Sequence, residues 1–136
     1  MCKDEFVELV SEHAKLGLED AERVSKSVLL TLRSRLTAVE VLELNDSLAC
    51  DLEDLWDAGW LQKFASKLQS LRELDRSEFL EQIRQAADLK TTEDATIVTQ
   101  IVFRILKSSI PKQEIEAMSK ALPSDLREFW QAAEAI

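Results

Sequence analysis

Apolar residues recur along this chain at the three- and four-residue spacing of amphipathic helices, and strand-like alternation is scarce. Phe6, Leu9 and Val10 predict a first helix, and Gly17 is expected to end it in the left-handed conformation. The chain is therefore expected to open with two amphipathic helices. The longer, second helix is predicted by an apolar stripe of Ala21, Val24, Val28, Leu32 and Leu36.

Two further helices are predicted to follow. Thr37 and Glu40 have the spacing of a capping box, which satisfies the first amides of a helix that runs through Leu48. A fourth helix is expected to start near Asp51, because a carboxylate stabilises the amino terminus of a helix. This fourth helix would contribute Trp56 to the core.

The same pattern is written twice in this sequence. Glu19–Ala21 returns as Glu93–Ala95 after a shift of 74 residues, and Trp56 returns as Trp130. The opening segment repeats at a shift of 73, which places one extra residue in a loop, where insertions are tolerated. Two similar halves can pack face to face and bury apolar surface that each would expose alone.

Residues 61–75 connect the two halves without any Gly or Pro, whereas flexible linkers are rich in Gly and Ser. Their apolar residues lie on one helical face, so we predict a packed helical connector. The expected fold is all-α: a pseudo-twofold tandem repeat of two four-helix units that form one helical domain. The expected boundaries are 3–60 for repeat one, 61–75 for the connector and 76–136 for repeat two.

The second helix of each half differs in polarity. In the first half this helix has a polar face, whereas Ile97–Leu106 is apolar over most of its circumference. A helix that is apolar on most sides is usually central. We therefore predict that the helix containing Ile97–Leu106 is the buried spine of the fold. The polar face of the first-half helix consists of Glu22, Arg23, Lys26 and Arg33.

Composition and charge exclude several classes of protein. With 46% hydrophobic residues among 136, the chain can form a packed core without a metal. A net charge of −9 disfavours binding to nucleic acid or to anionic lipid, because both need clustered Lys and Arg. No stretch approaches the roughly 18 apolar residues of a membrane span, and the amino terminus lacks signal-peptide features.

The two cysteines, Cys2 and Cys50, do not have the spacing of a CxxC motif. Together with the absence of an export signal, they favour a reducing, cytoplasmic location, in which a disulfide between them is not expected. Cys50 lies at a predicted helix start, where a thiol can become reactive, although an inert cysteine is the more common case.

The second half contains the stretches Ser77–Leu89, Glu93–Leu106 and Pro111–Trp130, and the last includes Leu-Pro-x-Asp-Leu-Arg-Glu-Phe-Trp. These stretches resemble a known family, the bacterial domain of unknown function 2267. The first half has the same frame, with Thr37 and Ala49 where prolines would be typical. The resemblance implies a small, soluble, all-helical bacterial protein and provides no activity or catalytic residues.

The sequence predicts no catalytic, cofactor-binding or metal-binding residues. His13 is the single histidine, and no second His, Cys or carboxylate has the spacing of a metal ligand beside it. Ser11 and Glu12 are its neighbours in sequence, but adjacent helical residues point away from each other and cannot form a triad. No cofactor is expected.

Residues 36–62 contain no basic residue and seven acidic ones. Such a run can be a solvated face, and that alternative remains open. It can also steer a basic or amphipathic protein partner. A calcium loop is disfavoured, because the alternating acidic spacing and the central glycine are missing. The candidate interaction surface consists of Glu53, Asp54, Asp57 and Trp60, since Trp is enriched at binding hot spots.

Two hypotheses for function follow from these observations. The first is a non-enzymatic protein-interaction or regulatory module. The second is a small-ligand-binding protein or an enzyme with a pocket between the two repeats. One histidine, no tyrosine and no glycine-rich phosphate loop make the second hypothesis the weaker one.

Overall fold

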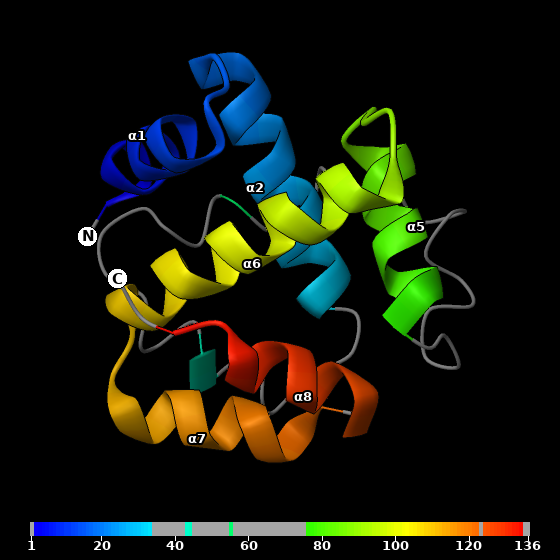
Figure 1. Ribbon diagram of the computed structural model, residues 1–136. Coiled ribbons are helices and arrows are strands. Elements are labelled where there is room, and N and C mark those ends of the chain that lie inside the picture. The colour runs from blue at the N-terminus through cyan, green and yellow to red at the C-terminus, as the bar shows by residue number, and fades with distance from the viewer. Residues whose placement is uncertain (1, 34–42, 45–54, 56–75, 123, 135–136) are drawn as a thin grey trace.

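The computed structural model describes residues 2–33, 43–44, 55, 76–122 and 124–134 (Figure 1). Within these ranges the chain forms helices and no strand, which confirms the all-α class. Among the described helices, none has both the length and the apolar character needed to cross a membrane. The helices are α1 (Lys3–Ala14), α2 (Leu18–Arg33), α5 (Arg76–Ala86), α6 (Thr92–Ser109), α7 (Lys112–Ala121) and α8 (Ser124–Ala132).

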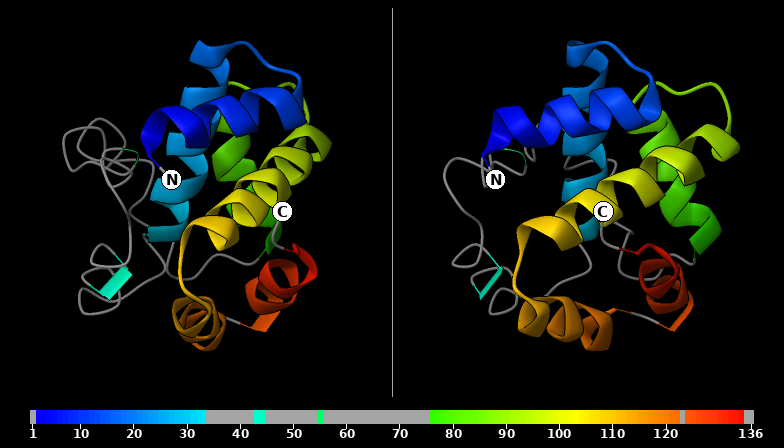
Figure 2. Two further views of the ribbon diagram at one scale, coloured as in Figure 1. Left: turned by 90° about the vertical axis from the view of Figure 1, so that its left-hand side faces the viewer. Right: turned by 60° about the vertical axis from the view of Figure 1, so that its left-hand side comes forward.

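Helix α6 crosses the middle of the molecule and contacts α1, α2, α5 and α8 (Figure 1). Helix α2 packs against α1, α5 and α6, and α7 and α8 lie side by side below them (Figure 2). The buried apolar side chains form one cluster that draws on both halves of the sequence. The periodic apolar positions therefore face a shared core, as their spacing predicts.

The end of α1 differs from the prediction. Lys15, not Gly17, adopts the left-handed conformation, with φ of 57°. The N–H of Leu16 donates to the carbonyl of Ser11 at 3.1 Å, which is the six-residue hydrogen bond of a Schellman motif. This bond requires the left-handed residue to precede Leu16 directly. The hydrogen bond to Ser11 therefore determines where the left-handed residue lies, and the presence of Gly17 two residues later does not.

Helix α5 ends in the same way. Asp88 has φ of 57°, and the N–H of Leu89 donates to the carbonyl of Arg84 at 2.9 Å. These residues lie 73 positions after their counterparts at the end of α1, so the two turns agree with the repeat register. Helices α1 and α2 correspond in this register to α5 and α6. The third and fourth helices of the first half and the connector 61–75 lie outside the described residues.

Helix α6 is central, as its apolar sequence predicts, but α2 is buried as extensively. Every residue of α2 from Ser27 to Leu32 is buried, whereas α6 keeps an exposed strip that includes Ile97, Gln100 and Arg104. Ser27 and Thr31 are buried at little cost, because each hydroxyl donates to a backbone carbonyl one turn earlier, at 2.8 and 2.7 Å. Both helices are therefore core elements, although α6 has the more apolar sequence.

One buried hydroxyl lacks such a bond. Thr99 on α6 is fully buried, yet its Oγ1 has no hydrogen-bond partner in the described structure. Ser25 occupies the corresponding place on α2, and its Oγ donates to the carbonyl of Ala21 at 2.7 Å. An unpaired buried hydroxyl is destabilising, so Thr99 marks a weak point of the core.

Candidate functional site

Basic side chains from neighbouring helices hold the carboxyl-terminal ends of three helices. The first is Lys107 of α6, whose Nζ donates to the carbonyls of Trp130 and Ala133, the latter at 2.5 Å. The same ammonium lies 4.7 Å from the centroid of the Trp130 ring. Burial lowers the pKa of Lys107, and the nearby carboxylate of Glu134 opposes this shift. The last carbonyls of a helix have no partner within the helix, so Lys107 caps α8.

Arg127 of α8 caps α7 in the same manner. Its Nε donates to the carbonyl of Ser119 at 2.6 Å, and its Nη2 donates to the carbonyls of Lys120 and Leu122 at 3.2 and 3.0 Å. The guanidinium thus faces the negative end of the α7 dipole.

Arg23 of α2 extends this arrangement to α5. Its Nε donates at 3.0 Å to the carbonyl of Ala87, the residue after α5, and its guanidinium forms an ion pair with Asp20 at 2.8 Å. Arg23, Lys107 and Arg127 are consequently bound to backbone carbonyls instead of forming a basic surface for phosphate.

A surface pocket of about 320 Å³, here termed the α1/α2 pocket, lies between the amino-terminal halves of α1 and α2. Two of its lining side chains are apolar, four are acidic and one is basic. Leu18 is 59% exposed at its edge, although a large apolar side chain is usually covered. The lining residues are Lys3, Asp4, Val7, Glu8, Leu18, Glu19 and Glu22.

The carboxylates of the α1/α2 pocket differ in their partners. Glu22 accepts from Lys3 at 3.1 Å and from Lys26 at 3.2 Å, and these hydrogen bonds lower the pKa of Glu22. Asp4, Glu8 and Glu19 are exposed, and none of them forms an ion pair within the described part of the chain.

Helix-end stabilisation explains part of this acidity. Asp4 and Glu19 lie in the first turns of their helices, where a carboxylate is stabilised by the helix dipole. Glu8 lies beyond the first turn of α1, so this effect does not account for it.

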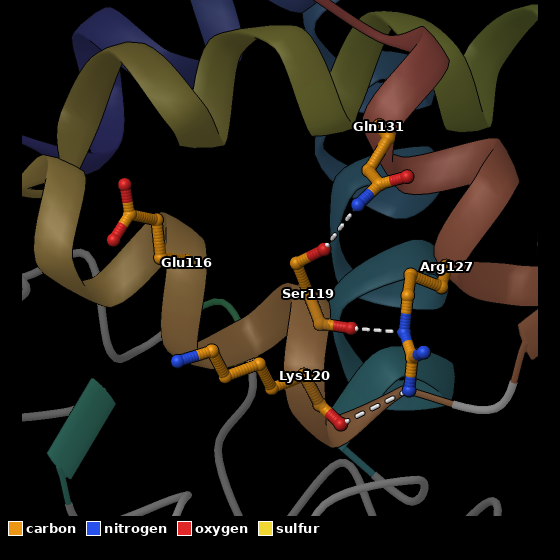
Figure 3. A pocket seen from close by; sticks show the side chains of 5 residues that line it. All are labelled: Glu116, Ser119, Lys120, Arg127 and Gln131. Carbon is orange, nitrogen blue, oxygen red and sulfur yellow. Dashed lines mark hydrogen bonds between the residues drawn. The ribbon is translucent and has the colours of Figure 1, made fainter.

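A second pocket of about 410 Å³, here termed the α7/α8 pocket, lies between α7 and α8 (Figure 3). Glu116, Ser119 and Lys120 of α7 and Arg127 and Gln131 of α8 line it. On one side, Gln131 Nε2 donates to Ser119 Oγ at 2.9 Å beside the Arg127 cap, which joins the two helices. The carboxylate of Glu116 and the ammonium of Lys120 lie on the other side (Figure 3).

The candidate surface expected from the sequence, Glu53, Asp54, Asp57 and Trp60, lies entirely outside the described residues. Its role therefore remains a prediction. His13 is exposed in the last turn of α1. Within the described ranges, no three His, Cys, Asp or Glu side chains form a potential metal site.

Cys2 differs from the expectation of unpaired thiols, because it is disulfide-bonded. It is the N-cap residue of α1. The sequence holds one other cysteine, Cys50, which lies outside the described residues. The expectation rested on a reducing compartment inferred from the sequence, and the disulfide at Cys2 contradicts that premise. The cysteines thus no longer support a reducing compartment.

Comparison with known proteins identifies one family. The family described as uncharacterized conserved protein (DUF2267) matches residues 3–129, which is nearly the whole chain. No curated protein and no solved structure matches the chain.

Proposed function

Since this chain belongs to the uncharacterized conserved protein family DUF2267, whose description names no activity, we propose a function from the pockets themselves. The protein is a non-enzymatic interaction module that binds a basic or amphipathic segment of a partner protein. The α1/α2 pocket is the proposed docking site.

The exposure of Leu18 beside three carboxylates without ion pairs carries this proposal. Leu18 is 59% exposed and adjoins the largely buried Val7 in the same pocket. An amphipathic helix could place an apolar side chain on Leu18 and a Lys or Arg on the carboxylates of Glu8 and Glu19. Three unpaired acids around an apolar contact therefore complement a cationic amphipathic segment.

Long-range electrostatics favour the same class of partner. The net charge of −9 attracts a cationic segment, and such steering acts mainly on the association rate. Exposed charges are screened over about 10 Å at 0.1 M salt, so binding should weaken with ionic strength.

Several finer features belong to the same proposal. The protein is a bacterial, cytoplasmic tandem repeat of two four-helix units, and the acidic surface of Glu53, Asp54, Asp57 and Trp60 extends the docking region. The cytoplasmic location is the least supported of these features, because Cys2 is disulfide-bonded and disulfides are rare in a reducing cytoplasm. Thiol labelling of the protein in intact cells tests the location, since a cytoplasmic protein should have reduced, labelled cysteines.

Titration of fluorescent synthetic helices tests the docking site. One probe carries Leu and Lys on opposite faces, and the other replaces every Lys with Glu. The double variant Leu18→Asn with Glu8→Gln should bind the Lys probe about five- to tenfold more weakly, because it loses an apolar contact and a charge pair. The Glu probe should not bind the wild-type protein.

The matched control is Ile97→Asn with Glu93→Gln on α6. Ile97 is 54% exposed and lies one helical turn after Glu93, so the control removes a comparable apolar side chain and one charge. Equal losses in both variants would mean that the peptide binds through net charge alone, and the docking site would then be wrong.

The second candidate function, a ligand-binding or enzymatic pocket between the repeats, has less support. Glu43 of the first half and Glu114, Ala117 and Met118 of α7 border a cavity of only about 10 Å³, enough for about one water molecule. The larger α1/α2 pocket contains no hydroxyl, thiol or imidazole among its described lining residues, and therefore offers no nucleophile of these types.

A further inference from the structure

The α7/α8 pocket differs from the α1/α2 pocket in holding opposite charges. Its volume of about 410 Å³ falls in the range of small-molecule sites. Arg127 donates from Nε and Nη2 to three backbone carbonyls, which leaves Nη1 as its remaining donor group in the described structure. Lys120 is exposed and donates no such bond, so it is the more accessible cation, and Glu116 is the anion of the pocket.

Glu116 and Lys120 are four residues apart on α7, which is the favourable order and spacing for an ion pair within one helix. Among the described residues, however, neither side chain takes part in an ion pair. An exposed ion pair at this spacing stabilises the paired arrangement of the two side chains only about twofold over the unpaired one. A ligand that binds both Glu116 and Lys120 therefore loses little free energy by replacing that ion pair.

The rest of the pocket supplies polar contacts opposite the two charges (Figure 3). Ser119 Oγ accepts from Gln131, which leaves the hydroxyl hydrogen of Ser119 free to donate to a ligand. This bond and the Arg127 cap also hold the α8 side of the pocket at a defined distance from α7 (Figure 3). The side of the pocket with Ser119, Arg127 and Gln131 is consequently fixed by hydrogen bonds before a ligand binds, and the side with Glu116 and Lys120 carries the charges.

We propose that the α7/α8 pocket binds a small zwitterion whose carboxylate pairs with Lys120 and whose ammonium pairs with Glu116. Four helical residues rise about 6 Å. The ligand should therefore carry its charges about one helical turn apart, as in a short ω-amino acid. This site is independent of the docking site between α1 and α2.

The test uses NMR titration with 4-aminobutyrate and 6-aminohexanoate as probes, read at the amides of Ser119 and Gln131. Butyrate and butylammonium, each with one of the two charges, are the matched single-charge probes. At least one zwitterion should cause saturable shifts at both residues and bind at least threefold more tightly than either single-charge probe, because two charge pairs form instead of one.

Glu116→Gln and Lys120→Met should each weaken binding of the zwitterion about three- to fivefold and make it no better than a single-charge probe. Lys112→Met and Glu128→Gln, which change exposed charges on the same two helices outside the pocket, should leave binding unchanged. Shifts that do not saturate, or binding that responds equally to all four variants, would overturn the proposal. Butyrate binding that equals zwitterion binding would do so as well.

Discussion

Two buried threonines should respond in opposite directions to the same substitution. Thr99 and Thr31 are both fully buried within helices, and replacement by Val keeps the shape while removing the hydroxyl. The hydroxyl of Thr31 donates to the carbonyl of Ser27 at 2.7 Å, whereas Thr99 Oγ1 has no partner in the described structure. The rotamer preference of Val in a helix affects both sites alike.

The expected magnitudes follow from this difference. Thr31→Val loses a buried hydrogen bond worth about 0.5–1.5 kcal/mol, and the carbonyl of Ser27 can keep its bond within the helix. Thr99→Val removes an unsatisfied hydroxyl whose burial costs about 1–3 kcal/mol. The variant at 99 should therefore be more stable than the wild type by about 1 kcal/mol, and the variant at 31 less stable by about the same amount.

Urea titration monitored by circular dichroism and tryptophan fluorescence measures both free energies of unfolding. The slope of the free energy with urea should be unchanged, since neither variant alters the surface exposed on unfolding. A loss of stability in Thr99→Val as large as that in Thr31→Val would show that the hydroxyl of Thr99 is hydrogen-bonded in solution, and the reasoning would fail.

Three other predictions concern single side chains. Lys107→Met should lower the free energy of unfolding by about 2 kcal/mol in a urea titration, because two carbonyls lose a charged donor while the cost of burying the ammonium is relieved. Val28→Asp and Val102→Asp should lose similar, large amounts, since both valines are fully buried; a far greater loss at 102 would restore the idea of a single spine. Hydrogen bonds from Arg84 lower the pKa of Glu81 to about 2, so this pair stabilises the fold above the usual carboxyl range and the benefit disappears as pH falls toward 2. The stability difference between the wild type and Glu81→Gln, measured from pH 6 to pH 2, should shrink over that window.

Apolar spacing predicts the described helices well, because a helix that buries one face must place apolar residues every three or four positions. The end of α1 shows the limit of residue preferences. Gly17 has the highest intrinsic tendency for the left-handed conformation, yet Lys15 adopts it. The six-residue hydrogen bond to Ser11 sets the position, and no single-residue preference contains that bond.

The burial of α2 was underestimated for a related reason. Hydroxyl side chains are counted as polar in a sequence pattern, but Ser27 and Thr31 donate to carbonyls of their own helix and can face the core. The stripe of α2 is consequently wider than its Val and Leu residues indicate.

The α1/α2 pocket could not be predicted from the sequence, because it depends on how two helices cross. Leu18 and Glu8 belong to different helices, and neither continues an apolar or acidic run. Leu18 lies three residues before Ala21 and therefore on the same helical face as the apolar stripe, so its spacing predicts burial. Its exposure follows from its position at the first residue of α2, which the sequence pattern does not indicate.

Net charge alone also understates how acidic the described surface is. Arg23, Lys107 and Arg127 donate to the ends of three helices, so their charges are partly used against helix dipoles. Asp4, Glu8 and Glu19, in contrast, have no basic partner among the described residues. Because capping uses the cations locally while these acids remain exposed, an approaching partner meets a more negative surface at α1 and α2 than a simple sum of charges gives. This distribution supports the cationic partner that we propose for the α1/α2 pocket.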